Sequence, residues 1–92
     1  MIGFMTLDLH IPQSRSLKDK RHVVKSLVDG VRARFNVSIA ELDALDLHQR
    51  ATLGVACVAN DAAHVHRVLE AVRSAIESRP DAVVCSVSIE ML

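Results

Sequence analysis

The period of the hydrophobic pattern changes along this chain in an order that few folds accommodate. Four segments are typical of strands and two have the 3.6-residue period of amphipathic helices. The expected strands are Met1–Ile11, Asn36–Asp43, Arg50–Ala59 and Ala82–Leu92, and the expected helices are Leu17–Phe35 and Ala62–Ser78. Two right-handed crossovers and one hairpin fold this order into a split βαβ sandwich. The sequence predicts an α+β, ferredoxin-like βαββαβ sandwich, with two helices on one face of a four-stranded antiparallel sheet.

In this topology the first and third strands are central and the second and fourth are edges. The third strand is apolar on both sides and carries Gly54 and Ala56, as expected of a central strand. In the last strand, alternation predicts that the core side holds Val83, Cys85, Val87, Ile89 and Met91. The face without helices is expected to show Phe4, Thr6, Asp8, His10, Thr52, Gly54, Ala56, Val58, Val84, Ser86, Ser88 and Glu90.

Local signals predict where the helices begin. Ser14 or Ser16 can cap the first helix with its hydroxyl oxygen, and Asn60-Asp61 marks the start of the second. Gly30 lies inside the first helix, where it costs about 1 kcal/mol against Ala. A close contact between helix and sheet is one reason for a glycine there.

Length and composition predict a single cytoplasmic domain over residues 1–92. Two independent cores would be too small in a chain of 92 residues, half of which are apolar. No apolar run is long enough to span a membrane, and no basic segment leads into a signal-like stretch. Cys57 and Cys85 are expected to face inward about two strand spacings apart, beyond disulfide reach.

Basic residues concentrate around the first helix. From Pro12 to Phe35 there are seven basic and two acidic residues, although the whole chain has 11 of each. One sector of the helical wheel holds Lys18, Arg21, Lys25 and Arg32, and Lys20 and Arg34 project from the other flank. Such a row suits successive phosphates of a nucleic acid. The alternative is a solvated helix face, and Asp29, at helical pair spacing from Lys25 and Arg32, would partly neutralise these cations.

The phosphate-binding candidates are therefore Arg15, Lys18, Lys20, Arg21, Lys25 and Arg50. Arg50 follows the hairpin loop, so it joins the helix only if that hairpin bends toward the start of the helix. The open sheet face is a second candidate surface. With Phe4 as its one aromatic residue it is poorly suited to stacking RNA bases, and its small, partly apolar residues favour packing on a second copy. The interface candidates there are Phe4, Thr6, Thr52 and Ala56.

The sequence shows no signature of an enzyme, a metal site or a cofactor. His64 and His66 are two residues apart and point about 200° apart on a helix, so they cannot share an ion. No catalytic triad, glycine-rich phosphate loop or CxxC motif is present. We therefore expect a non-catalytic protein without cofactor.

Three blocks carry a family resemblance: HIPQSRSLKDKR (His10–Arg21), FNVSIAELD (Phe35–Asp43) and QRATLGVACVAND (Gln49–Asp61). With the closing strand, they resemble the YlxP-like bacterial proteins, a family of unknown function, over essentially the whole chain. The matching polar positions are Ser16, Lys18, Lys20, Arg21, Gln49, Arg50, Asn60 and Asp61. His48 departs from the family pattern, in which many members have Trp. The resemblance supplies no catalytic residues.

The resemblance implies a small ferredoxin-like cytosolic protein. Genes of members often lie near those of translation initiation factor two and ribosome-binding factor A, which implies a role in ribosome maturation or translation. The first functional hypothesis is therefore a module that binds ribosomal RNA or a ribosomal subunit. The alternatives are a homodimeric protein-interaction domain that uses the open sheet face, and a regulatory domain that binds a small molecule.

Overall fold

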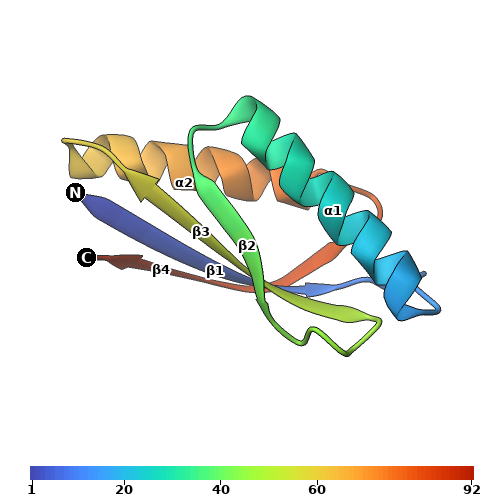
Figure 1. Ribbon diagram of the computed structural model, residues 1–92. Helices are drawn as coiled ribbons and strands as arrows, with labels where there is room; N and C mark the ends of the chain where they lie inside the picture. The colour runs from blue at the N-terminus through green and yellow to red at the C-terminus, as the bar shows by residue number, and fades with distance from the viewer.

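The computed structural model describes all 92 residues and confirms the predicted order of elements. The elements are β1 Ile2–His10, α1 Leu17–Arg34, β2 Ser38–Asp43, β3 Arg50–Val58, α2 Ala62–Glu77 and β4 Val83–Met91. All strand pairs are antiparallel and the sheet has the order β2-β3-β1-β4, so β1 and β3 are central (Figure 1). The chain therefore has the ferredoxin-like α+β fold.

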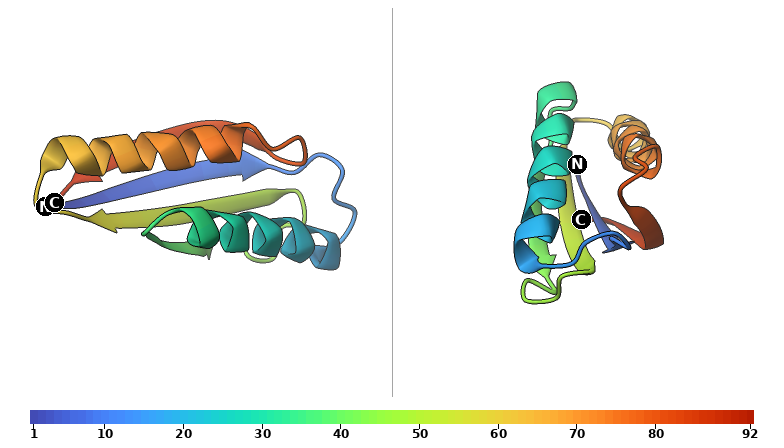
Figure 2. Two further views of the ribbon diagram at one scale, coloured as in Figure 1. Left: turned by 90° about the horizontal axis from the view of Figure 1, so that it is seen from above. Right: turned by 90° about the vertical axis from the view of Figure 1, so that its right-hand side faces the viewer.

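Both helices lie on the same face of the sheet, and the two termini meet at one end of the molecule (Figure 2). Because only one face is covered, alternate side chains of β1 are buried. Met5, Leu7 and Leu9 have no exposed surface, whereas the residues between them are partly exposed. Neither helix is long and apolar enough to cross a membrane.

Both predicted helix starts are confirmed by side-chain caps. The Ser16 hydroxyl accepts the backbone N–H of Asp19 at 3.0 Å, and the Asp61 carboxylate accepts that of Ala63 at 3.0 Å. Each bond satisfies a first-turn N–H that has no partner within the helix. Ser14, the other cap candidate, is buried and donates its hydroxyl to the Ser16 carbonyl.

A bulge in β4 overturns the predicted alternation at the start of that strand. Asp8 pairs with Ser86 but Leu9 pairs with Val84, so Cys85 is an extra residue opposite β1. The extra residue reverses the faces before it. Cys85 and Val83 are consequently exposed, and Val84 packs against the core. The predictions that Cys85 and Val83 face the core and that Val84 lies on the open face are wrong.

The three glycines of the chain occupy different environments. A Cβ at Gly3 would collide with the buried Val65 side chain and lie 2.9 Å from Leu69 Cδ1. A Cβ at Gly30 would meet nothing within 4 Å, so no close contact explains that glycine. The expectation of a tight helix–sheet approach at Gly30 is wrong.

We expect Gly30→Ala to raise the free energy of unfolding by about 0.5–1 kcal/mol, because alanine restricts the unfolded chain and Gly30 has a helical backbone with free space. Urea unfolding followed by circular dichroism measures the change. Gly3→Ala is the contrasting variant, and overpacking against Val65 should lower the same quantity by about 1–3 kcal/mol. Changes of the same sign in both variants would contradict this account of the two glycines.

Candidate nucleic-acid interface on helix α1

Helix α1 turns its apolar side to the sheet and leaves most of its cations in solvent. Val24, Leu27, Val28 and Val31 are buried against the sheet and α2. The exposed cations of this segment are Arg15, Lys18, Arg21, Lys25, Arg32 and Arg34. At 1.5 Å per residue, the row from Lys18 to Arg32 extends over about 21 Å. The structure thus places three of the six predicted phosphate-binding residues, Lys18, Arg21 and Lys25, along one outer surface, and Arg15 is exposed just before the helix.

Lys20 does not belong to this surface, because its side chain is fully buried. Its Nζ donates to Glu41 Oε2 at 2.9 Å, to the Ala44 carbonyl at 2.7 Å and to the Leu45 carbonyl at 3.2 Å. An ammonium has three hydrogens, and all three are used. Lys20 therefore ties α1 to β2 and to the following hairpin loop. This corrects the expectation that Lys20 projects to solvent with the other cations and meets phosphates.

Some of the exposed cations already have an ion-pair or hydrogen-bond partner within the chain, and others have none. Lys25 forms an ion pair of 2.7 Å with Asp29, as the spacing predicts, and Arg32 donates to the Ile39 carbonyl at 2.9 Å. Arg15, Lys18 and Arg21 have no carboxylate within ion-pair distance. The cations without an ion-pair partner thus lie at the N-terminal half of α1, where the helix dipole is also positive and where Asp19 accepts the Arg15 backbone N–H at 2.9 Å.

A groove between α1 and the edge strand β2 extends this basic surface. It has a volume of about 470 Å³, and its charged lining consists of Arg21, Lys25, Arg32, Asp29 and Glu41. Sequence reasoning did not find this groove, because it needs the position of β2 relative to the helix. It adds a concave surface beside the row of cations.

Arg50 lies on the other side of the molecule from α1. It pairs with His10 across the sheet, and its Nη1 atom lies 3.9 Å from the Cys85 sulfur on the open face. The hairpin before β3 therefore does not carry Arg50 to the start of α1. The condition under which Arg50 would join the helix cations is therefore not met, and Arg50 is not part of the basic surface.

Beside Arg50 the open face holds a polar cluster that the sequence did not reveal. Asp8 Oδ1 accepts the Thr52 hydroxyl at 2.8 Å, and Oδ2 accepts the Ser86 hydroxyl at 2.8 Å. Hydrogen bonds from Ser86 and from Thr52, with a smaller contribution from the Arg50 charge, hold the pKa of Asp8 below its ordinary value of 3.8. The three residues belong to β1, β3 and β4, so only the strand register brings them together.

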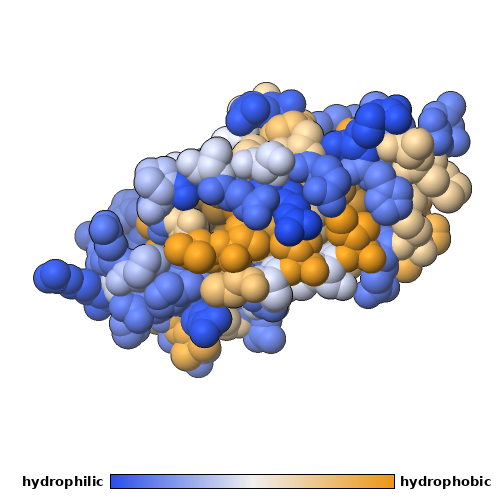
Figure 3. Space-filling view, turned by 180° about the vertical axis from the view of Figure 1, so that it is seen from behind, coloured by the Kyte–Doolittle hydropathy of each residue, from blue (hydrophilic) through white to orange (hydrophobic).

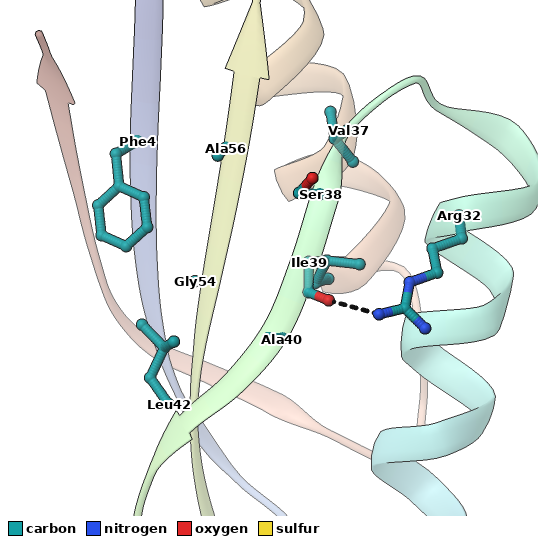
Figure 4. Close-up of a pocket in the computed structure, with 9 residues that line it drawn as sticks. All are labelled: Phe4, Arg32, Val37, Ser38, Ile39, Ala40, Leu42, Gly54 and Ala56. Atoms are coloured by element: carbon teal, nitrogen blue, oxygen red, sulfur yellow. Dashed lines mark hydrogen bonds between the residues drawn. The ribbon is translucent and has the colours of Figure 1, made fainter.

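All four interface candidates lie on the open face, but their surroundings differ in polarity. The candidates are Phe4, Thr6, Thr52 and Ala56. Thr52 is engaged with Asp8. Phe4 instead lines a shallow apolar hollow of about 330 Å³ (Figure 4). There, the Phe4 and Leu42 side chains lie over Gly54, where a Cβ would come within 2.5 Å of Leu42. Pairing of two copies through this face stays a prediction.

Side chains that could hold a metal are dispersed. No group of three His, Cys, Asp or Glu residues comes together anywhere in the chain. His64 and His66 are both exposed on α2, and Cys57 is buried as predicted while Cys85 is exposed. The surface features with a recognisable chemistry are thus the basic row, the groove and the open face.

The structure defines a small ferredoxin-like domain with one open sheet face and a basic outer helix. Residues 2–89 match the family described as "Protein of unknown function (DUF503)", and the chain belongs to this family. It is 37% identical over 81 residues to the "Uncharacterized protein YlxP" of Bacillus subtilis (strain 168), a match that covers 88% of each chain. These comparisons confirm the resemblance to the YlxP-like proteins.

Replacement of Lys20 by Met should cost about 3–5 kcal/mol of unfolding free energy, because it leaves Glu41 and two carbonyl groups without their donor. Glu41 is only 16% exposed, so water cannot fully replace the ammonium. Chemical denaturation measures the loss. The double variant Lys20→Met/Glu41→Met removes both charges and should recover part of it. A single variant as stable as the wild type would show that the pair does not join α1 to the hairpin.

The hydrogen-bonded Asp8 carboxylate should make stability depend on acid pH. Its pKa is lower in the folded than in the unfolded chain, so its stabilising contribution is present above about pH 4 and is lost as pH falls through the folded-state pKa. In Asp8→Asn the free energy of unfolding should therefore fall less steeply on acidification. Asp81, whose pKa is lowered by Arg79, gives a second variant for comparison. A slope unchanged by Asp8→Asn would contradict the assignment.

Proposed function

We propose that this chain is a non-catalytic RNA-binding module that contacts phosphates through α1 and the loop before it. The observation that carries the proposal is the group Arg15, Lys18 and Arg21, whose side chains are exposed and have no carboxylate within ion-pair distance, while Asp19 accepts only the backbone N–H of Arg15. Lys25 and Arg32 continue the row beside the groove. A row of cations along a helix meets the repeated negative charge of a nucleic-acid strand.

The rest of the surface supports a phosphate-based mode of binding over one that reads bases. The chain has two aromatic residues, Phe4 and Phe35, and they lie on different sides of the sheet. Phe4 packs with Leu42 over Gly54, and Phe35 packs against the core beneath Arg34. Stacking of successive bases needs a series of exposed rings. We therefore propose binding that depends on RNA shape and charge.

Ribosomal RNA is the RNA we propose, since the family resemblance implies a role near translation and ribosome maturation. Structured RNA presents phosphates of both strands across its grooves, which suits a straight helix edge about 21 Å long. The overall charge of the chain is zero, so attraction is local to α1 and does not come from the whole protein.

Binding of a structured ribosomal RNA fragment should be strongly salt dependent. With Arg15, Lys18, Arg21, Lys25 and Arg32 in contact, the log–log salt slope should be about −3.5 to −4.5. Arg21→Glu should weaken binding to every RNA tested and reduce the magnitude of the slope by about 1. Fluorescence anisotropy at several salt concentrations measures both quantities.

Arg67→Glu is the matched control, because Arg67 is exposed on α2, has no ion-pair partner and gives the same change in charge. It should leave affinity and slope near the wild-type values. Equal losses in the two variants would show that binding follows net charge alone. Equal affinity of Arg21→Glu and wild type would refute a role for α1.

A further inference from the structure

The two edge strands of the sheet are protected unequally. β2 has six residues, is interrupted by a bulge at Leu42, and its Ile39 carbonyl accepts a hydrogen bond from Arg32. β4 has nine residues and contains neither Pro nor Lys. Beyond its bulge at Cys85, residues 86–91 form a regular extended edge. A long edge without such protection is a template for pairing with another chain.

The side of β4 that faces the helices is apolar and incompletely covered. Val84, Val87, Ile89 and Met91 pack against the core, yet each keeps part of its surface in solvent. Seen from behind, the molecule shows a continuous apolar band between polar atoms above and below (Figure 3). An apolar band beside an unprotected strand edge has the features of a protein contact surface.

The peptide groups of β4 are oriented for this contact. The Leu92 N–H donates to the Ile2 carbonyl at 2.8 Å, so this pair is a hydrogen-bonded one. Hydrogen-bonded and non-hydrogen-bonded pairs alternate in an antiparallel ladder. The peptide groups of Val87, Ile89 and Met91 therefore point away from β1, toward the free edge. The side chains of the same three residues pack against the core and remain partly exposed.

We infer that β4 is the contact between two copies of this chain, paired antiparallel about a two-fold axis at Ile89. Val87 of each copy then faces Met91 of the other, which extends the hydrogen-bonded ladder and keeps the apolar sides together. This register places Glu90 opposite a serine, Ser88 of the second copy. An axis at Glu90 would instead set two carboxylates against each other.

The exposed flank of α2 is complementary to its own two-fold copy. Ala75 and Arg79 lie against α1, so the flank on the β4 side carries Glu70, Arg73 and Glu77. Each α2 packs mainly over β1, and the two β1 strands would be three strand spacings apart, about 14 Å. Long Arg and Glu side chains bridge such a gap. Arg73, which pairs with Glu70 at 3.9 Å and with Glu77 at 3.4 Å in its own helix, can therefore also meet carboxylates of the other copy above the apolar band.

The dimer makes one continuous sheet with all four helices on one face. The two α1 helices lie at its outer ends, because α1 packs against β2 at the edge away from β4. The contact uses none of the cations proposed to bind RNA. It therefore stands or falls independently of the proposed function.

Sedimentation equilibrium should show a dimer whose fraction increases from micromolar to millimolar protein. Over the same range, amide hydrogen exchange at Val87, Ile89 and Met91 should slow, because these amides become paired. This second measurement needs no variant. A wild type that remains monomeric at millimolar concentration, or exchange at these amides that does not depend on concentration, would overturn the inference.

Val87→Lys introduces a charge that can reach solvent from the half-buried edge, and it should give a folded monomer. The control Ala56→Arg lies on the open face and should remain dimeric. Dissociation by Ala56→Arg but not by Val87→Lys would locate the contact on the open face and overturn the assignment to β4.

A charge exchange on α2 tests the helix flank. Arg73→Glu should weaken the dimer, and Glu70→Arg/Arg73→Glu should restore it, because the double variant re-creates opposite charges across the axis. Equal dimer affinity of the single variant and the wild type would exclude α2 from the contact.

Discussion

The whole molecule depends on the fact that its sheet is covered on one face only. Burial of Met5, Leu7 and Leu9 of β1 beneath α1 and α2 forces their neighbours onto an uncovered face. Both helices of the chain pack on this one face around a core of 18 residues, so no helix remains to cover the other face. Uncovered surfaces therefore remain on the outside of α1, on the open face and at the two edges of the sheet.

The buried Lys20 has a structural role, in contrast to the exposed cations beside it on α1. Its ammonium joins α1 to Glu41 and to two carbonyls of the β2–β3 loop. A lysine withdrawn from water is tolerated only where all its donors are satisfied. Because Lys20 neutralises Glu41, that carboxylate does not oppose Arg21 across the groove. The basic character of the groove thus depends on a cation that never reaches solvent.

The two edge strands of the sheet, β2 and β4, differ in the chemistry of their surroundings. At the β2 edge, Arg32 donates a hydrogen bond to the outward carbonyl of Ile39. The positive charges of Arg21 and Lys25 beside it favour a polyanion. At the β4 edge, peptide groups are free and the neighbouring side chains are apolar, which favours another strand. Since β1 and β3 separate these edges, a second copy at β4 and an RNA at α1 do not compete for space. The two proposed contacts are therefore sterically compatible within one domain.

The amino-acid sequence by itself determined the order of elements, both helix caps and the inward side of β1, because hydrophobic period and capping are local properties. The sheet topology followed from that order and from the right-handedness of the crossovers. It also identified the exposed cations Lys18, Arg21 and Lys25 from their sector on the helical wheel. Tertiary structure alone decided that Lys20 is buried and that Arg50 lies on the opposite face, since both depend on where the β2–β3 hairpin lies. The bulge at Cys85 and the cluster around Asp8 likewise follow from strand register, in which one extra residue exchanges the two faces of a strand.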